Sequence, residues 1–246
     1  AALRTHCHDA EVVATACVAL YNLTRSTPSA CAPLVHSHGG GAALAAALLQ
    51  GTTLGVDTEV AACRALYELS MGEGTEMQLM RDGCGAALLA ALRRHGGNLE
   101  VARAACGTLW NLTVAEDGCD AVLSQLGKGA VAAVVSALQR HVEDEAVVAA
   151  ACGAFRNLMA KPAGCAVMGG YTSALAPAAT IVAALEMHAG AVEVVRGACG
   201  ALWNLIDGTP AGSGTAAVWC DDAVAVATGL RAALLRHVGD EEVVRC

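Results

Sequence analysis

The sequence predicts an all-α protein, built as a solenoid of about five stacked helical repeats. The first observation is a recurring segment: Ala-Cys-Gly-Thr-Leu-Trp-Asn-Leu at 105–112 returns as Ala-Cys-Gly-Ala-Leu-Trp-Asn-Leu at 198–205, with looser copies at 16–23, 62–69 and 151–158. The second is its period. The cysteines of the copies are 46, 43, 46 and 47 residues apart, and they are Cys17, Cys63, Cys106, Cys152 and Cys199. This period is typical of helical units that each contact only their neighbours.

The recurring segment has the apolar pattern of an amphipathic helix. Relative to its Asn, an Ala stands six residues earlier, the Cys five earlier and an apolar residue two earlier, and a Leu follows directly. At about 100° per residue these positions share an arc of about 120°, and the Asn points away from it. The Asn positions are Asn22, Asn111, Asn157 and Asn204, with Glu68 in the second copy. We predict long helices near 11–24, 57–70, 98–113, 144–159 and 191–206, and a partial sixth at 240–246.

A second periodic pattern, Ala-Leu-x-x-His, precedes the long helix. It ends an apolar run such as 86–92, which predicts a middle helix that stops at the His. A His at that place can bond the last carbonyl groups of the helix. Its return at five places along the chain favours a structural role over catalysis or metal binding. These residues are His6, His95, His141, His188 and His237.

A shorter helical segment lies between each long helix and the next middle helix. Examples are 75–81 and 118–126, and the segment often ends in a glycine, as at Gly39, Gly83 and Gly127. Each repeat therefore comprises a short, a middle and a long helix with glycine at the joints. The Gly/Ser/Thr-rich stretch 207–215 is expected to protrude as a loop.

Composition and charge limit the classes of partner. The formal net charge of the 246 residues is −8, which argues against binding to nucleic acid or to an anionic membrane and favours a basic peptide or protein. The longest uncharged stretch, 162–185, is interrupted by glycine and proline. It fits two short buried helices better than a membrane span, which needs about 20 mostly apolar residues.

The cysteine pattern favours reduced, buried thiols. Equivalent residues in stacked helices lie roughly 10 Å apart, whereas a disulfide requires Cα atoms within about 7 Å. The sequence has no Cys-x-x-Cys segment, so a structural zinc site is not expected. We expect a cytoplasmic protein in a reducing compartment, without a cofactor; cytoskeletal, ciliary and nuclear locations are also compatible with this pattern.

Catalytic motifs are not expected either. The runs at 39–41 and 83–85 lack the strand and the Lys that a phosphate-binding loop needs. The cluster His6-Cys7-His8-Asp9 has metal-binding residue types, but it lies beside a periodic His. No Ser/His/Asp or Cys/His set stands outside the repeat pattern, and we therefore expect a protein that is not an enzyme.

Three helices per repeat and the ending Ala-x-x-Ala-Leu-x-Asn-Leu resemble the armadillo repeat. The resemblance covers residues 1–246 as a single array. It implies a right-handed solenoid whose long helices line a concave groove. It also implies that an Asn ladder, here Asn22, Asn111, Asn157 and Asn204, bonds the backbone of an extended peptide. Glu68 departs from that ladder.

A second departure concerns the nuclear-import adaptors of that family, which carry Trp four residues before the Asn. This chain has Val18, Arg64, Gly107, Gly153 and Gly200 there. Its aromatic residues stand directly before the Asn instead. The pattern is similar to catenin-type and scaffold armadillo proteins, which implies a non-catalytic scaffold or adaptor. A nuclear-transport adaptor that binds basic peptides is the alternative.

The resemblance and the exposed positions of the long helices together predict a partner-binding groove. Its candidate residues are Tyr21, Asn22, Tyr67, Glu68, Arg103, Trp110, Asn111, Arg156, Asn157, Arg196, Trp203 and Asn204. Two interpretations stay open for the tryptophans: flat contact surfaces beside Gly107 and Gly200, or packing against the long helix of the adjacent repeat. Two interpretations also stay open for the asparagines: each can bind a partner, or it can bond a loop of a neighbouring repeat. The glutamates one turn before Arg103 and Arg196 can simply pair with these arginines.

The register of the repeats predicts an array that continues beyond both ends. Residues 1–6 match the end of a middle helix, and 241–246 match the start of a sixth long helix. Solenoids need terminal units with a polar outer face, and neither end supplies one. We expect a segment of a longer array, or a subunit capped by others in a large assembly.

Overall fold

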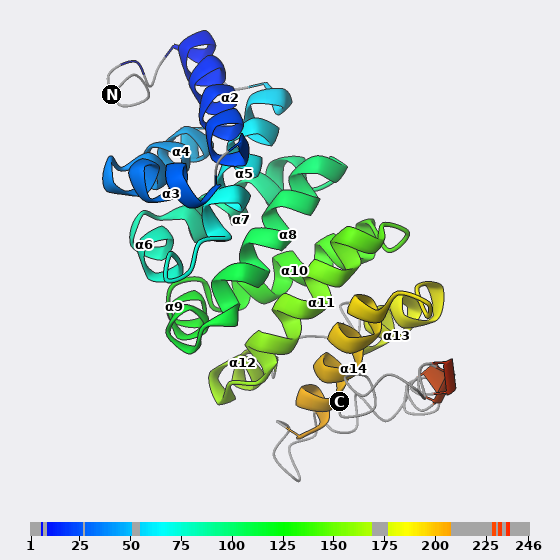
Figure 1. The fold of residues 1–246 in the computed structure, drawn as a ribbon. Helices are drawn as coiled ribbons and strands as arrows, with labels where there is room; N and C mark the ends of the chain where they lie inside the picture. The colour runs from blue at the N-terminus through cyan, green and yellow to red at the C-terminus, as the bar shows by residue number, and fades with distance from the viewer. Residues whose placement is uncertain are drawn as a thin grey trace. The chain divides into compact units, whose positions relative to one another are not determined.

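The computed structural model describes residues 6, 9–26, 28–50, 55–168, 177–207, 228–229, 231–232 and 235–236. In these residues the protein is helical and contains no strand, which confirms the all-α prediction at that level. Contacts group the chain into two compact units, Ala1–Leu126 and Gly127–Cys246. Figure 1 shows the helices with their labels.

Unit 1 contains three helices of the predicted long class, and each lies beside its equivalent one repeat away. The long helices α2, α5 and α8 pack in sequence, the middle helices α4 and α7 pack together, and so do the short helices α6 and α9 (Figure 1). The bounds are α2 Ala10–Ser26, α3 Pro28–Ser37, α4 Gly40–Gln50, α5 Val56–Ser70, α6 Glu76–Arg81, α7 Cys84–His95, α8 Leu99–Val114 and α9 Glu116–Leu126.

Unit 2 repeats this pairing. The long helices α11 and α14 pack together, the middle helices α10 and α13 pack together, and each middle helix also covers the long helix that follows it. The bounds are α10 Lys128–Arg140, α11 Glu145–Met159, α12 Pro162–Met168, α13 Pro177–Met187 and α14 Val192–Asp207. The long helices of both units match the five predicted ranges to within two residues. The predicted partial helix at 240–246 and the loop after Asp207 lie outside the described residues.

Most of the long helices start at an Asp or Asn side chain. Asp9 accepts hydrogen bonds from the backbone N–H groups of Glu11 and Val12, both at 3.1 Å, at the start of α2. Asn98 does the same at the start of α8, and Asp144 accepts from the N–H of Val147 at 3.0 Å at the start of α11. A side-chain oxygen at this place satisfies N–H groups that have no partner inside the helix.

The predicted glycine joints have the backbone geometry that requires glycine. Gly39, Gly83 and Gly127 stand directly before the middle helices α4, α7 and α10, with φ of 71°, 80° and 47°. A positive φ brings a Cβ atom too close to the backbone, so glycine is strongly preferred. These three joints let the chain reverse between the short and the middle helix.

The core of each unit is made of small apolar side chains and periodic cysteines. The five cysteines of the recurring segment are buried, and so are Leu66, Leu109, Phe155 and Leu202. The Leu that follows the Asn position is buried in α5, α8, α11 and α14, but Leu23 in α2 is 48 % exposed. None of the eight cysteines whose side chains the structure describes is in a disulfide. Burial raises the pKa of Cys17 and of Cys106 to about 12.

Two of the middle-helix histidines, His95 and His188, contact the preceding repeat. His188 donates from Nε2 to the carbonyl oxygen of Val142, in the turn after α10, at 2.7 Å. The Nε2 of His95 lies 3.6 Å from the carboxylate of Glu59 on α5. The expectation that these rings bond the last carbonyls of their own helix is therefore wrong for His188, because stacking brings a neighbouring turn within reach. His237 lies outside the described residues.

In the part of the chain that the structure describes, no single helix is both long enough and apolar enough to cross a membrane. The neighbours α9 and α10 reach that length and apolarity only when they are counted together across the break at Gly127.

Candidate partner-binding surface

The twelve predicted groove residues all lie on long helices, and none of them is fully buried. We use the term long-helix face for the exposed and half-exposed side of these helices, described separately in each unit. Its residues in unit 1 are Tyr21 and Asn22 on α2, Tyr67 and Glu68 on α5, and Arg103, Trp110 and Asn111 on α8. Its residues in unit 2 are Arg156 and Asn157 on α11, and Arg196, Trp203 and Asn204 on α14.

One contact recurs between successive long helices. The residue directly before the Asn position in one helix touches the residue four before that position in the next. In the first such pair the guanidinium of Arg64 lies 5.6 Å from the centre of the Tyr21 ring, within range of a cation–π contact. The same two positions meet again at Tyr67 and Gly107, and at Arg156 and Gly200.

The glycines of this contact are needed for close approach. A Cβ atom on Gly107 would lie 2.6 Å from the ring of Tyr67, and a Cβ on Gly200 would lie 2.4 Å from the Cδ of Arg156. Both glycines are buried and lie inside helices, where glycine is otherwise unfavourable. One interpretation left the space beside these glycines open to a partner that contacts the tryptophans, but side chains of the preceding long helix fill it.

The aromatic residues of the long-helix face differ in their packing and exposure. Tyr67 packs against the adjacent repeat, as the second interpretation held for the tryptophans. Trp203 is 61 % exposed on α14, and Trp110 is half-buried on α8. The indole of Trp203 is therefore the more accessible of the two tryptophan side chains.

Two asparagines of the predicted ladder donate to the end of the preceding long helix. The Nδ2 of Asn111 donates to the Oγ of Ser70 at 2.9 Å, and the Nδ2 of Asn204 donates to the carbonyl oxygen of Arg156 at 2.8 Å. These are bonds to a neighbouring repeat, although the partner is a helix end rather than a loop. Asn157 accepts from Arg156 at 3.4 Å, and Asn22 is exposed. The internal bonds fix the orientation of the Asn111 and Asn204 amide groups.

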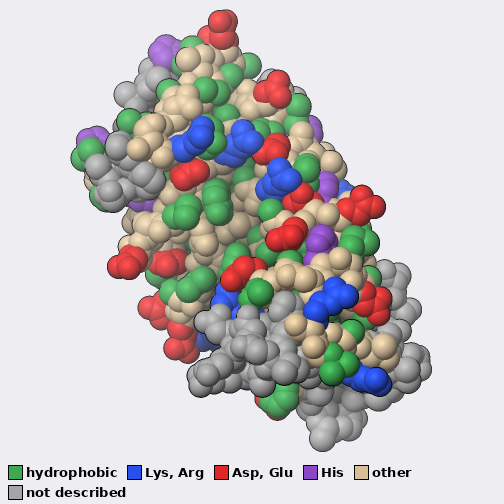
Figure 2. Space-filling view, turned by 45° about the vertical axis from the view of Figure 1, so that its right-hand side comes forward, with side chains coloured by type: hydrophobic (Ala, Val, Ile, Leu, Met, Phe, Trp, Pro, Cys, Tyr) green, Lys and Arg blue, Asp and Glu red, His purple; other side chains and the backbone are tan. Residues whose placement is uncertain are grey.

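Charged side chains on the long-helix face pair with one another. Arg64 on α5 forms an ion pair with Glu100 on α8, and Arg103 bonds the other oxygen of Glu100 at 3.0 Å. Arg196 pairs with Glu193 one turn earlier on α14. Such part-exposed pairs contribute about 0–1 kcal/mol each. Figure 2 shows acidic and basic side chains interspersed over much of the view, with a group of acidic ones along its lower left edge.

A buried ion pair beneath unit 1's surface was missed by the sequence reasoning. The carboxylate of Glu59 is 0 % exposed and accepts from the Nε and Nη2 of Arg94 at 3.1 and 3.2 Å. Arg94 also donates to the carbonyl oxygen of Leu48, so the pair joins α4, α5 and α7. A signal was present, because the equivalent position is apolar in every other copy: Val13, Ala102, Val148 and Val195.

The other chemical candidates have structural roles where they are described. The described residues contain no group of three or more His, Cys, Asp or Glu side chains that could hold a metal ion. Asp9 caps α2, while Cys7 and His8 lie outside the described residues. The glycine runs at 39–41 and 83–85 lead into α4 and α7.

Comparisons with known proteins add no identification. No protein-family model matches the sequence, and no curated protein matches it.

Proposed function

We propose that this protein is a non-catalytic scaffold or adaptor of the armadillo type, and that its long-helix face binds an extended segment of a partner protein. One observation carries the proposal: within each unit, successive long helices pack side by side and present equivalent polar and aromatic side chains that are not buried. An extended peptide places chemical groups at a regular spacing, which suits a surface with a regular repeat.

The asparagines supply the chemistry for backbone recognition. A primary amide has two N–H donors and one carbonyl acceptor, so a single internal bond leaves further capacity. In Asn111 and Asn204 one N–H group is held by the preceding helix. The other N–H group and the oxygen would pair with the N–H and C=O groups of a bound peptide. Because the amide orientation is fixed in advance, less conformational freedom is lost on binding.

The side chains around the asparagines favour a partner segment that is uncharged or mildly basic. Glu68 lies on the same face, the basic residues Arg64 and Arg103 are paired with Glu100, and the whole chain carries −8. Exposed Trp203 supplies an apolar contact, and aromatic and arginine side chains are common where binding energy concentrates.

A nuclear-transport adaptor remains the alternative, but the structure gives it little support. The position four residues before the Asn would have to hold an aromatic ring against lysine stems. In this chain Arg64 is engaged with Tyr21, and Gly107 and Gly200 are covered by Tyr67 and Arg156. A lysine-rich peptide that bound with micromolar affinity or tighter would reverse this preference.

Site-specific photo-crosslinking in native extract tests the proposal. A benzoylphenylalanine is placed at Asn22 or Glu68 on the long-helix face of unit 1, and a matched one at the exposed Ala86 on the middle helix α7 of the same unit. We expect both face positions to capture segments of the same partner and position 86 to capture none of it. Equal capture at all three positions would contradict the proposed binding face.

A further inference from the structure

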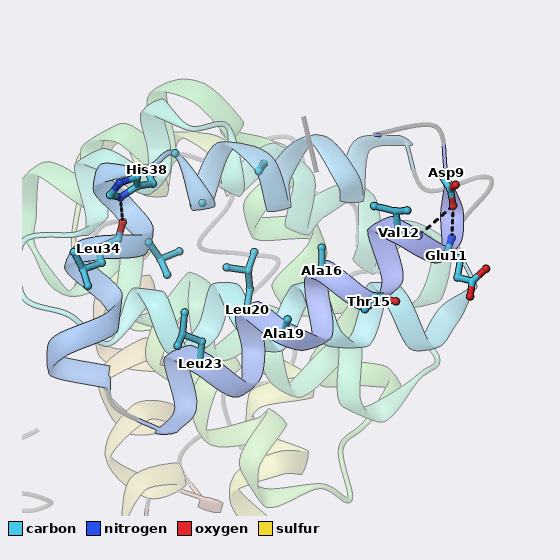
Figure 3. Close-up of a pocket in the computed structure, with 14 residues that line it drawn as sticks. Asp9, Glu11, Val12, Thr15, Ala16, Ala19, Leu20, Leu23, Leu34 and His38 are labelled. Atoms are coloured by element: carbon cyan, nitrogen blue, oxygen red, sulfur yellow. Dashed lines mark hydrogen bonds between the residues drawn. The ribbon is translucent and has the colours of Figure 1, made fainter. Parts of the chain in front are cut away.

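Unit 1 exposes apolar side chains beside α2 and again at the C-terminal ends of α5 and α8. Beside α2 lies a cavity of about 820 Å³, and Figure 3 shows Val12, Ala16 and Leu20 projecting from α2 toward α4. The sequence pattern places the end of a middle helix at residues 1–6, and middle helices pack on the later long helices that follow them. A preceding middle helix of the same array would therefore account for this cavity, but not for the apolar side chains at the helix ends.

The C-terminal ends of α5 and α8 expose large apolar residues at equivalent positions. Met71 directly follows α5 and Val114 is the last residue of α8, so each stands three residues after the position of the Asn ladder. They are 59 % and 67 % exposed, and Met77 on α6 is 38 % exposed. Exposed apolar side chains that lie together and are rimmed by polar residues are typical of interaction sites.

Contacts between the helices bring these residues to one edge of unit 1. Asn111 of α8 donates to Ser70, the last residue of α5, so the two helices end side by side. A turn of five residues, 71–75, leads from α5 into α6. Figure 1 shows α6 and α9 side by side, and a Cβ atom on Gly118 of α9 would lie 3.0 Å from the Cβ of Glu76. The ends of α5 and α8 and the starts of α6 and α9 therefore form a continuous surface.

This surface is strongly acidic. The segments 65–80 and 104–127 contain three Asp or Glu residues each and no Lys, Arg or His. Glu76 and Asp117 stand in the first turns of α6 and α9, where a negative charge stabilises a helix. Glu73 lies outside any helix and is exposed, so helix stability does not account for it. We use the term acidic edge for Met71, Glu73, Glu76, Met77, Val114 and Asp117.

We propose that the acidic edge docks a basic amphipathic helix of a partner protein, with leucine or methionine along one side and Lys or Arg next to them. The carboxylates complement the basic residues, and the flexible methionine side chains adapt to an apolar stripe. The acidic edge is separate from the long-helix face, so the proposal does not depend on the proposed function.

The side chains of the acidic edge favour a helix over an extended segment. The long-helix face has asparagine amides that can bond a peptide backbone, whereas the acidic edge offers carboxylates and apolar groups. An α-helix satisfies its own backbone groups through internal hydrogen bonds. A docked helix therefore needs only the side-chain contacts that this edge supplies, as in other complexes where an amphipathic helix binds an apolar surface.

Stacking of repeats leaves the acidic edge uncovered. Repeats pack through the sides of their helices, as α2 does on α5 and α5 on α8, whereas the edge lies at the helix ends. Residues 55–126 around it are described without a gap. Residues 51–54 precede α5, whose 15 residues place its start about 22 Å from its end. A further repeat at either end of the array would stack elsewhere.

Peptide binding to the whole chain tests the proposal. The probe is a fluorescent peptide of about 18 residues, made of leucine and lysine, with the leucines on one side of a helix. Its control has the same composition in an order that gives a helix no apolar side. Measured by anisotropy, the amphipathic peptide should bind saturably and at least about tenfold more tightly than its control.

Two matched double variants locate the binding site. Met71→Gln with Glu73→Gln changes the acidic edge, and Met187→Gln with Glu186→Gln changes the end of α13 in unit 2. Each pair removes one exposed methionine and one exposed carboxylate, and Met187 is 53 % exposed. The first pair should weaken binding of the amphipathic peptide by about tenfold or more, and the second by less than about twofold. Urea unfolding checks that both variants are folded.

A variant of the long-helix face keeps this test separate from that of the proposed function. Asn22→Ala should change the affinity for the amphipathic peptide by less than about twofold, because Asn22 lies outside the acidic edge. A larger loss would place the peptide on the long-helix face and overturn the proposal.

Three further results would also overturn the proposal. Equal binding of the two peptides would show attraction by net charge alone. Equal effects of the two double variants would place the peptide elsewhere. In the purified protein, a benzoylphenylalanine at Met77 that cross-links to another segment of the same chain would assign the edge to an internal contact.

Discussion

The ring of Tyr67 lies directly against the backbone of Gly107 in the next long helix, so closely that a Cβ atom on Gly107 would be 2.6 Å from it. Two effects then oppose each other in a Gly107→Ala variant. Alanine favours a helix over glycine by about 0.5–1 kcal/mol, and overpacking costs typically about 1–3 kcal/mol. We expect Gly107→Ala to lower the free energy of unfolding by about 1 kcal/mol in urea titration.

The decisive control is the same substitution in a Tyr67→Ala background. With the ring removed, only the helix preference remains, and Gly107→Ala should become stabilising by about 0.5–1 kcal/mol. If the substitution had the same sign in both backgrounds, the tyrosine would not be the cause.

The buried pair of Glu59 and Arg94 predicts a large effect of removing one partner. Arg94→Leu leaves the fully buried carboxylate of Glu59 without its arginine. Breaking such a pair typically destabilises a protein by about 3–5 kcal/mol. Glu100→Gln, at the part-exposed pair with Arg64, should change the free energy of unfolding by less than about 1 kcal/mol.

A double variant in which both residues are apolar provides the complementary measurement to Arg94→Leu alone. Glu59→Val introduces the residue type that other copies have at this position, and it should recover much of the stability lost in Arg94→Leu. Additive losses in the double variant would show that the two residues act separately.

Core packing predicts different effects for two equivalent leucines. Leu112 is fully buried in α8, whereas Leu23 of α2 is 48 % exposed. Leu112→Ala should destabilise unit 1 by about 2–5 kcal/mol, and Leu23→Ala by less than about 1 kcal/mol. Chemical unfolding followed by circular dichroism compares the two, and similar losses would contradict the observed difference in burial.

The buried thiols predict a loss of stability in alkali. Burial raises the pKa of Cys106 from 9.0 to about 12 in the folded protein, while the unfolded chain ionises near the ordinary value. The unfolded state therefore releases this proton first as pH rises, and stability present below about pH 9 is lost between there and pH 12. Above pH 9 the slope for one such group approaches about 1.4 kcal/mol per pH unit.

The measurement compares urea midpoints at pH 8, 9 and 10 for the natural chain and for Cys106→Ala. The variant should lose less stability over this range, because one of the buried thiols is gone. An identical pH dependence in both proteins would assign the effect to other titrating groups.

The elements of each repeat could be predicted because they depend on local sequence. The apolar stripe marked the long helices, and the glycines at 39, 83 and 127 marked joints that the structure confirms through their positive φ. Contacts between repeats could not be predicted in the same way. The position of Tyr67 on its own helix does not reveal that its ring reaches Gly107, because that depends on how two helices are offset along their axes.

For the candidate surface, too, local features could be predicted and contacts between helices could not. The sequence correctly placed its residues on the non-buried side of the long helices. It left two roles open for the asparagines, and the internal bonds of Asn111 and Asn204 depend on where the preceding helix ends. The buried ion pair of Glu59 was not predicted, because the prediction used residues that the copies share. Glu59 stands where the other copies have an apolar residue.

The pairing of Glu59 with Arg94 has a consequence for how such a chain can change over generations. Duplication or exchange of whole repeats would keep most internal contacts, since neighbouring copies present similar apolar sides. A second repeat separated from the third, however, would bury an acidic group with no counter-charge unless its new neighbour also supplied an arginine. We therefore expect the second and third repeats to be kept together. A recombinant that separates them should fold only if the glutamate is also replaced.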